Sequence, residues 1–183
     1  IVNCQLLWYL EEYQLISDRQ YGFRRGRSAG DLLVYLTHKW AEAVESKGEA
    51  LAASLDIAKA FDRVWHKALL SKLPSYGLPG KLCSWITSFL ADRSIKVVVD
   101  GACSDQKFVN AGVPQGCVLS PTLFLLHIND LLQIRNIHCY ADDSTVDTSY
   151  TGRANISREN VVENRNKLVS EIESSLNEVS NWG

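Results

Sequence analysis

The amino-acid sequence predicts an α+β fold in which helices pack on an antiparallel sheet. Three observations support this class. Several segments repeat apolar residues at the spacing of an amphipathic helix. Shorter apolar runs that are bounded by turn residues are typical of strands. Two helical stretches separate the first expected strand from an expected hairpin, so strands and helices do not alternate regularly as they do in a parallel sheet.

Length and composition are those of one globular domain. The chain has 183 residues, of which 46% are hydrophobic and 22% are charged, and this excludes a disordered or collagen-like chain. No apolar run approaches about 18 residues, so we expect no membrane span. The first residues do not lead from a basic region into an apolar run, so we expect no signal peptide. Because the sequence contains no methionine, we expect it to be a piece of a longer chain.

The charges are balanced in number but uneven in position. The chain has 19 Lys and Arg against 21 Asp and Glu, and its pI is about 6.1. A general electrostatic footprint for nucleic acid usually gives a pI above about 9, so the net charge argues mildly against one. However, three arginines crowd the segment 24–27, and acids lie inside apolar runs. The odd number of cysteines, without a targeting signal, favours reduced thiols in an intracellular compartment.

The first third of the chain predicts two helices and a strand. Apolar residues on one face predict a helix over 4–13, and a turn-rich stretch follows at 20–27. Ser28 is expected to cap the next helix, with Asp31 in its first turn, and this helix should run to about Ser46. The apolar run 50–57 is interpreted as a strand that is buried on both faces.

The rest of the chain predicts further helices and two strand pairs. The segment 94–99, the turn at Asp100-Gly101 and the segment 103–109 are typical of a β-hairpin. The segments 137–141 and 144–148 are interpreted as two strands that only Asp142 and Asp143 separate. The remaining expected helices span about 64–73, 79–90, 120–132 and 158–181.

Three acids stand where carboxylates are not expected. Asp56 ends an apolar strand, and Asp142-Asp143 forms a tight turn between strands. Two ionised carboxylates about 4 Å apart repel by on the order of 4 kcal/mol at an effective dielectric constant near 20. A fold tolerates them if the site is open to water, if one acid is protonated, or if a divalent cation lies between them. If the first strand lies beside the later pair, Asp56 can share a metal ion with Asp142, and such oxygen ligands suit Mg²⁺.

Each feature also has an ordinary interpretation. A single Asp after a strand is commonly a turn residue or a helix cap, and an Asp-Asp pair between strands is by default a hairpin turn. Three motifs in one order are much less common by chance. These motifs are Leu55-Asp56-Ile57-Ala58-Lys59-Ala60-Phe61-Asp62, Gly112-Val113-Pro114-Gln115-Gly116-Cys117-Val118-Leu119-Ser120-Pro121 and Tyr140-Ala141-Asp142-Asp143.

These three motifs resemble successive palm motifs of reverse transcriptases. Two further segments are similar to those of non-LTR retrotransposons in the Jockey-like group, namely Gln20-Tyr21-Gly22-Phe23-Arg24 and Asn129-Asp130-Leu131. The resemblance covers about residues 5–183. It implies a palm-like antiparallel sheet packed on helices, with part of the fingers. On this basis residues 1–48 would be partial fingers and residues 49–183 a palm that stops before the thumb, together one reverse transcriptase domain fragment.

The resemblance also implies roles for individual residues. Asp56 and Asp142 match the two metal-binding aspartates, Asp143 matches the third acid, and the Ile57 carbonyl would complete a ligand shell. Phe61 matches the ring that excludes a ribose 2′-hydroxyl, and the less favoured alternative is an ordinary core residue. The expected nucleotide-binding residues are Phe61, Gln115, Gly116 and Ala141. The expected phosphate- or template-binding residues are Arg24, Arg25 and Arg27, which could instead form a solvated loop.

The implied function is RNA-directed DNA polymerisation with Mg²⁺, for which Mn²⁺ could substitute. The partners would be an RNA template, a DNA primer and deoxynucleoside triphosphates, within a cytoplasmic and nuclear retrotransposon ribonucleoprotein and without a membrane. Two alternatives stay open: a catalytically silent nucleic-acid-binding palm relic, and a telomerase-like, intron-type or viral RNA polymerase palm. Since the upstream basic motif and the thumb of the family are missing, we expect little or no polymerase activity from the isolated chain.

Overall fold

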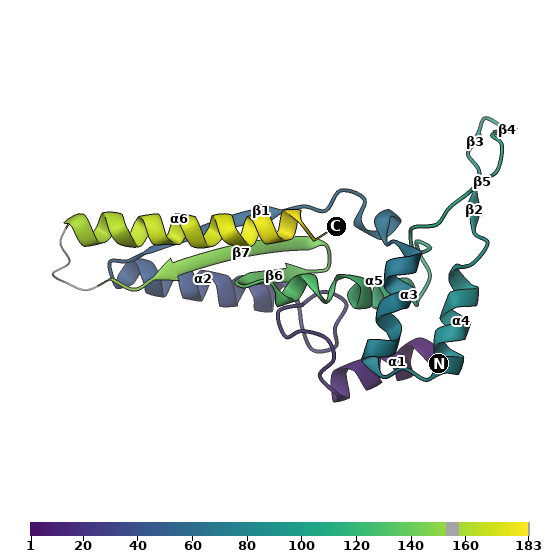
Figure 1. The fold of residues 1–183 in the computed structure, drawn as a ribbon, viewed down its shortest axis with the longest axis horizontal. Helices are drawn as coiled ribbons and strands as arrows, with labels where there is room; N and C mark the ends of the chain where they lie inside the picture. Colours follow the sequence, from purple (N-terminus) through teal and green to yellow (C-terminus); the bar gives the residue numbers. More distant parts are fainter. Residues whose placement is uncertain (153–157, 183) are drawn as a thin grey trace. The chain divides into compact units, whose positions relative to one another are not determined.

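The chain combines helices with antiparallel strands, as the sequence predicts (Figure 1). A computed structural model describes residues 1–152 and 158–182. It contains two compact units: one joins Ile1–Ile16 to Ala58–Ile128, and the other joins Ser17–Ile57 to Asn129–Gly183. We call them the helical unit and the sheet unit. The assignment of residues 1–48 to fingers and 49–183 to a palm is a different partition, and it stays a prediction.

The sheet unit is built on three antiparallel strands. They are β1 (Glu49–Leu55), β6 (Ile137–Tyr140) and β7 (Asp143–Tyr150), in the order β1-β7-β6. The first strand therefore lies beside the later strand pair, which is the condition under which the sequence allows Asp56 to approach Asp142. A short 3-10 helix, η3 (Leu131–Gln133), precedes β6.

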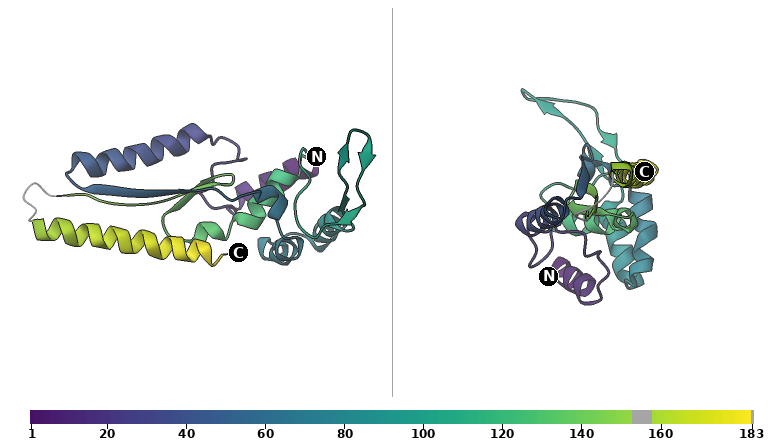
Figure 2. Two further views of the ribbon diagram at one scale, coloured as in Figure 1. Left: turned by 90° about the horizontal axis from the view of Figure 1, so that it is seen from above. Right: turned by 90° about the vertical axis from the view of Figure 1, so that its left-hand side faces the viewer.

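Two long helices cover opposite faces of this sheet (Figure 2). Thr148 of β7 donates a hydrogen bond to Glu171 of α6 (Arg158–Ser180) at 2.8 Å. Its neighbour Asp147 accepts one from Trp40 of α2 (Ala29–Glu45) at 3.2 Å. Because adjacent residues of a strand point to opposite faces, α2 and α6 must lie on different sides of β7.

Local signals explain where α2 begins and ends. Ser28 caps the helix as predicted, and it forms a capping box with Asp31, in which each side chain bonds the backbone N–H of the other residue. At the other end, the Gly48 amide donates to the Ala43 carbonyl at 2.8 Å and the Lys47 amide to the Val44 carbonyl at 2.9 Å. This bonding pattern requires a left-handed residue, and Lys47 adopts it with φ 59°. The chain then turns directly into β1.

The predicted burial of β1 on both faces is wrong. None of its seven residues is fully buried, and the strand lies at the edge of the sheet. The central strand is β7, in which Ser144, Val146, Asp147 and Thr148 are buried. The apolar run in β1 consists largely of alanines, whose small side chains give the same sequence signal for an edge strand as for a central one.

The helical unit packs α1 (Val2–Glu12), α3 (His66–Lys72), α4 (Gly80–Leu90) and α5 (Ser120–Ile128) around an apolar core. The 3-10 helices η1 (Ala60–Arg63) and η2 (Leu73–Tyr76) flank α3. The predicted hairpin forms as two short ladders, β2 (Ser94–Ile95) with β5 (Lys107–Phe108) and β3 (Val98–Val99) with β4 (Ala102–Cys103). The core includes Leu69, Leu73, Ile86, Leu90, Leu123 and Phe124. Among the residues described, no helix is long and apolar enough to cross a membrane.

Candidate active site

Strand pairing in the sheet unit gathers the three expected acids at one end of the sheet. Leu55 pairs with Ser144 at the end of the β1–β7 ladder, so Asp56, which follows Leu55, and Asp143, which precedes Ser144, both lie at this end of the sheet. Tyr140 pairs with Asp143, which leaves Ala141 and Asp142 as the turn between β6 and β7. Two motifs that are far apart in the sequence therefore deliver their carboxylates to the same sheet end.

The acids at this end are open to water. Asp56 and Asp143 are exposed and Asp142 is half-buried. Solvent screens the repulsion between neighbouring carboxylates, so the fold tolerates acids close together at this end. Their oxygens also remain accessible to a ligand that approaches from solution.

The donor atoms suit a divalent cation that a substrate helps to hold. Within the two ranges described, no group of three or more His, Cys, Asp and Glu side chains is placed so that it could hold a metal ion. Mg²⁺ typically takes only one or two protein carboxylates and completes its shell with water and substrate phosphates. Hard carboxylate oxygens at an exposed sheet end fit that requirement.

The turn that carries Asp142 is conformationally demanding. Ala141 has φ 58°, in the left-handed region that costs a residue with a Cβ about 1–2 kcal/mol. Within the hairpin, Ser144 donates to the Asp142 carbonyl at 3.4 Å, and the Cys139 and Ser144 side chains bond each other at 3.1 Å. Burial raises the pKa of the Cys139 thiol to about 11. The thiol thus stays protonated beneath the acid-bearing turn.

A second group of expected residues lies in the helical unit. The Val113 amide donates to the Phe61 carbonyl at 2.9 Å, and Gln115 donates to Asp62 at 3.3 Å. The half-buried Phe61 ring stacks on Phe124 with the ring centroids 4.4 Å apart. The structure therefore joins the Phe61 motif to the Gln115 loop. Contact of the Phe61 ring with a core phenylalanine is what its ordinary interpretation expects, and its nucleotide role stays a prediction.

The two other expected nucleotide-binding residues differ in exposure. Gly116 is exposed and has φ 80°, a conformation in which a side chain would be strained. Ala141 is only 5% exposed, and its backbone amide and carbonyl both bond within the sheet unit. The Ile57 carbonyl follows Asp56 at the end of β1, and its role as a metal ligand is untested.

The three expected phosphate-binding arginines have different environments. Arg24 is buried, and its guanidinium donates to the Ser17 carbonyl at 2.7 Å. Arg27 is half-buried, pairs with Asp18 and lies over the Tyr21 ring. Arg25 is exposed. Of the three, Arg25 presents its charge most openly to solvent, while Arg24 holds the loop together.

Sequence reasoning assigned no role to Gln20, which the structure places in contact with the acid-bearing turn. Gln20 is fully buried, and its side chain bonds both backbone polar groups of Ala141. The sequence marked it only as part of a motif, since nothing local predicts burial of a glutamine in a turn-rich segment.

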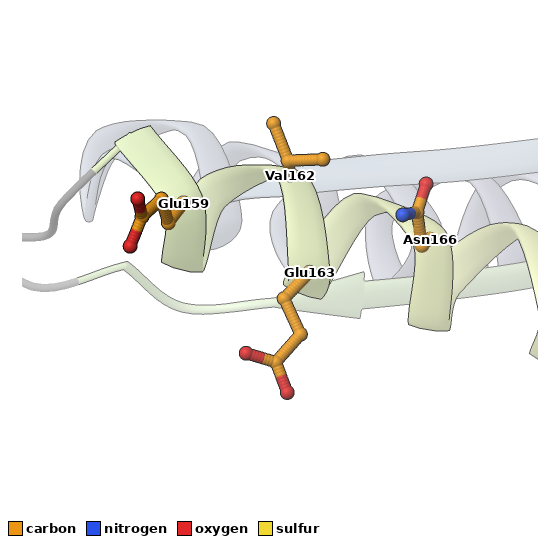
Figure 3. Close-up of a pocket in the computed structure, with 4 residues that line it drawn as sticks. All are labelled: Glu159, Val162, Glu163 and Asn166. Carbon is orange, nitrogen blue, oxygen red and sulfur yellow. The ribbon is translucent and has the colours of Figure 1, made fainter.

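A surface hollow on α6, shown in Figure 3, is a separate feature. It is lined by Glu159, Val162, Glu163 and Asn166 of one helix and includes none of the three acids.

Carboxylates at one end of an antiparallel sheet are the kind of ligand that an enzyme uses to bind a cation together with a phosphate-bearing substrate. Comparison with known proteins identifies the family. Residues 1–178 match the family described as reverse transcriptase (RNA-dependent DNA polymerase). The chain belongs to this family, and the resemblance inferred from its three motifs is confirmed.

Individual relatives narrow the group. The chain is 43% identical over 127 residues to the RNA-directed DNA polymerase from mobile element jockey of Drosophila melanogaster, which covers 69% of this chain and 14% of the relative. It is 41% identical over 121 residues to the jockey polymerase of Drosophila funebris, covering 66% of this chain and 13% of the relative. It is 33% identical over 133 residues to the probable RNA-directed DNA polymerase from transposon X-element of Drosophila melanogaster, covering 73% and 14%. The matched part thus spans about one seventh of the length of these relatives. They are polymerases of non-LTR, Jockey-like retrotransposons, the group that the motifs indicate.

Proposed function

We propose that this chain forms the catalytic palm, with part of the fingers, of an RNA-directed DNA polymerase. The observation that carries the proposal is the strand pairing of β1 with β7, which brings Asp56 to the sheet end that bears Asp142 and Asp143. Membership of the reverse transcriptase family supports the same assignment. Intact acids in all three positions argue against a silent relic.

In the proposed reaction, the primer 3′-hydroxyl attacks the α-phosphate of a deoxynucleoside triphosphate, and pyrophosphate leaves. Asp56, Asp142 and the Ile57 carbonyl would hold the divalent cations, and Asp143 adds negative charge beside them. When bound, Mg²⁺ lowers the pKa of the attacking hydroxyl and stabilises the charge of the leaving pyrophosphate. The exposed positions of Asp56 and Asp143 leave room for a phosphate-bearing ligand beside them. Mn²⁺ accepts the same oxygen ligands and should substitute.

Residues besides the three acids would contact the nucleotide, the template and the primer. Phe61 would exclude a ribose 2′-hydroxyl, and Gln115 would lie against the incoming nucleotide and the template. Gly116 would contact the nucleotide, and Ala141 would line the primer-terminus side of the turn. The proposed partners are an RNA template, a DNA primer and deoxynucleoside triphosphates. Arg25 is the preferred phosphate contact, because it is the most exposed of the three arginines. The proposed setting is a retrotransposon ribonucleoprotein in the cytoplasm and nucleus.

Primer extension tests this function. The measurement uses these residues within a longer chain that carries the flanking regions of the jockey relatives, on RNA and DNA templates. Asp142→Asn should abolish Mg²⁺-dependent extension, because it removes a charge from the proposed cation site. Asp105→Asn makes the same chemical change at an exposed position in the helical unit and should leave extension unchanged. Equal extension by wild type and Asp142→Asn would show that Asp142 is not required for the reaction.

The sugar-discriminating role of Phe61 has its own test. Phe61→Val in the same longer chain should admit ribonucleotides, because a smaller side chain leaves room for a 2′-hydroxyl. The readout is the ratio of kcat/KM for a deoxynucleotide to that for the matching ribonucleotide. If Phe61 only packs on Phe124, the variant loses stability and this ratio stays at the wild-type value.

A further inference from the structure

The segment 19–21 extends the sheet on the side of β6 that β7 leaves free. The Tyr21 amide donates to the Cys139 carbonyl at 2.8 Å, and the Cys139 amide donates to the Arg19 carbonyl at 2.9 Å. Gln20 forms a parallel bridge with Cys139. The hairpin that carries Asp142 is therefore bonded on both sides, to β1 through β7 and to this segment through β6.

The side chain of Gln20 reaches along the sheet to the turn. Its Oε1 accepts hydrogen bonds from the Ala141 amide at 2.9 Å and from the Gly22 amide at 2.8 Å. Its Nε2 donates to the Ala141 carbonyl at 3.3 Å. One fully buried side chain thus satisfies both backbone polar groups of the residue that precedes Asp142.

Two neighbours fix the position of Gln20. A Cβ on Gly22 would lie 2.2 Å from the Ala141 nitrogen, so the chain passes the turn too closely for any side chain. Arg24, with its side chain 4% exposed, donates to the carbonyls of Ser17 at 2.7 Å and Gln20 at 3.4 Å. The Arg24 guanidinium therefore fixes the loop that contains Gln20, and the Gln20 side chain fixes the turn at Ala141.

We propose that Gln20 is a positioning residue that sets the direction of the Asp142 carboxylate by fixing the backbone of Ala141. This inference rests on the proposed polymerase function of the same site. Ala141 has φ 58°, a conformation that an alanine adopts only where its surroundings impose it. Without the bonds from Gln20 the turn relaxes, and the Asp142 oxygens move relative to Asp56. Mg²⁺ demands near-ideal octahedral geometry, so its binding should respond more strongly than nucleotide binding.

The test replaces Gln20 by methionine, which keeps the length of the side chain and removes all three hydrogen bonds. In the longer chain defined above, the Mg²⁺ concentration for half-maximal extension should rise by about tenfold, as is common when a group that orients a metal ligand is lost. The KM for the deoxynucleotide should change by less than about twofold. Gln133→Met makes the same chemical change at an exposed position of the sheet unit and should match wild type.

Two readouts do not depend on catalysis. Hydrogen exchange of the Ala141 amide should quicken in Gln20→Met, because that amide loses its acceptor. Mn²⁺ binding measured by electron paramagnetic resonance should weaken in parallel with the Mg²⁺ requirement. Gln20→Glu keeps the two accepted bonds and loses the donated one, so it should give an intermediate shift, and it carries the test if Gln20→Met does not fold.

The outcomes separate the two proposals. Unchanged Mn²⁺ binding and Mg²⁺ requirement in a Gln20 variant that is merely less stable would overturn the positioning role. An equal rise in the nucleotide KM and the Mg²⁺ requirement would also overturn it, because the whole site would then be disturbed. If wild type and Asp142→Asn extend primers equally, the proposed function fails, whereas Ala141 exchange still reports whether Gln20 holds the turn.

Discussion

A fully buried carboxylate ties α2 to the central strand of the sheet, and its removal has a calculable cost. Asp147 of β7 is 0% exposed. Its Oδ2 lies 2.8 Å from Lys39 Nζ and accepts a hydrogen bond from Trp40 Nε1 at 3.2 Å. Its Oδ1 lies 3.9 Å from His138 Nε2. Three side chains from two elements therefore converge on one acid.

The substitution Asp147→Asn removes the charge and keeps the shape. Breaking a fully buried ion pair costs about 3–5 kcal/mol. The Lys39 side chain is 29% exposed and can turn its ammonium toward water, so we discount that range. The Trp40 bond survives because an amide oxygen can accept it. The expected loss is about 2 kcal/mol, close to that of one charge-assisted hydrogen bond.

Urea unfolding at pH 7.5, followed by circular dichroism, measures this loss. A reduction of about 2 kcal/mol should lower the Tm by about 4–8 °C in a chain of this length. Glu49→Gln is the matched control, since Glu49 pairs with Arg165 on the surface of the same sheet unit, where the Arg165 side chain is 63% exposed. Screening by water makes that pair weak, so the control should lose far less stability. Equal losses in the two variants would refute the argument that burial decides the contribution of Asp147.

Three more predictions concern the sheet unit. Burial lowers the pKa of His138 below 6.5, so the unfolded chain binds the proton first as pH falls through about 6.5. The free energy of unfolding should therefore decline below that pH, and it should decline less steeply in His138→Gln. Urea titrations at several pH values measure this difference. Lys47 has φ 59°, so Lys47→Gly should raise the Tm and increase the free energy of unfolding by about 0.5–1 kcal/mol. Gly48→Ala should lower the free energy of unfolding by more than about 2 kcal/mol, because the new Cβ would lie 1.8 Å from the Tyr150 carbonyl oxygen. The thiol of Cys139, whose pKa burial raises to about 11, should resist iodoacetamide at pH 8 until the chain unfolds, and rapid labelling of the folded chain, detected by mass spectrometry, would contradict this.

Most elements of the fold could be predicted because their signals are local. The helix that begins after Ser28 has a capping box and an apolar stripe, and both lie within its own residues. The strands around Asp142-Asp143 have turn residues between apolar runs. The burial of β1 could not be predicted, because an alanine-rich strand has the same pattern at the edge of a sheet and at its centre. Which position it takes depends on the pairing with β7, a contact between distant residues.

The acids of the candidate site could be predicted for a different reason. A charged residue inside an apolar run contradicts the pattern around it, and Asp56, Asp142 and Asp143 each do so. Gln20 produces no such contradiction, since a glutamine among turn residues is ordinary. Its importance depends on burial and on three hydrogen bonds, two of them to a residue more than a hundred positions later. Only the structure could reveal it.

The sheet explains why a motif without a catalytic side chain accompanies the acidic motifs in one sequence. A hairpin turn at the end of two strands is free to twist unless something outside the hairpin holds it. Here β1 bonds the β7 side and delivers Asp56, while the segment 19–21 bonds the β6 side and delivers Gln20 to the turn. The proposed metal site would require orientation as well as charge, so residues that orient the turn would be under the same chemical constraint as the carboxylates themselves. If Gln20 has the proposed positioning role, a chain that kept all three acids but lost the glutamine would keep the acids of the site and lose their orientation.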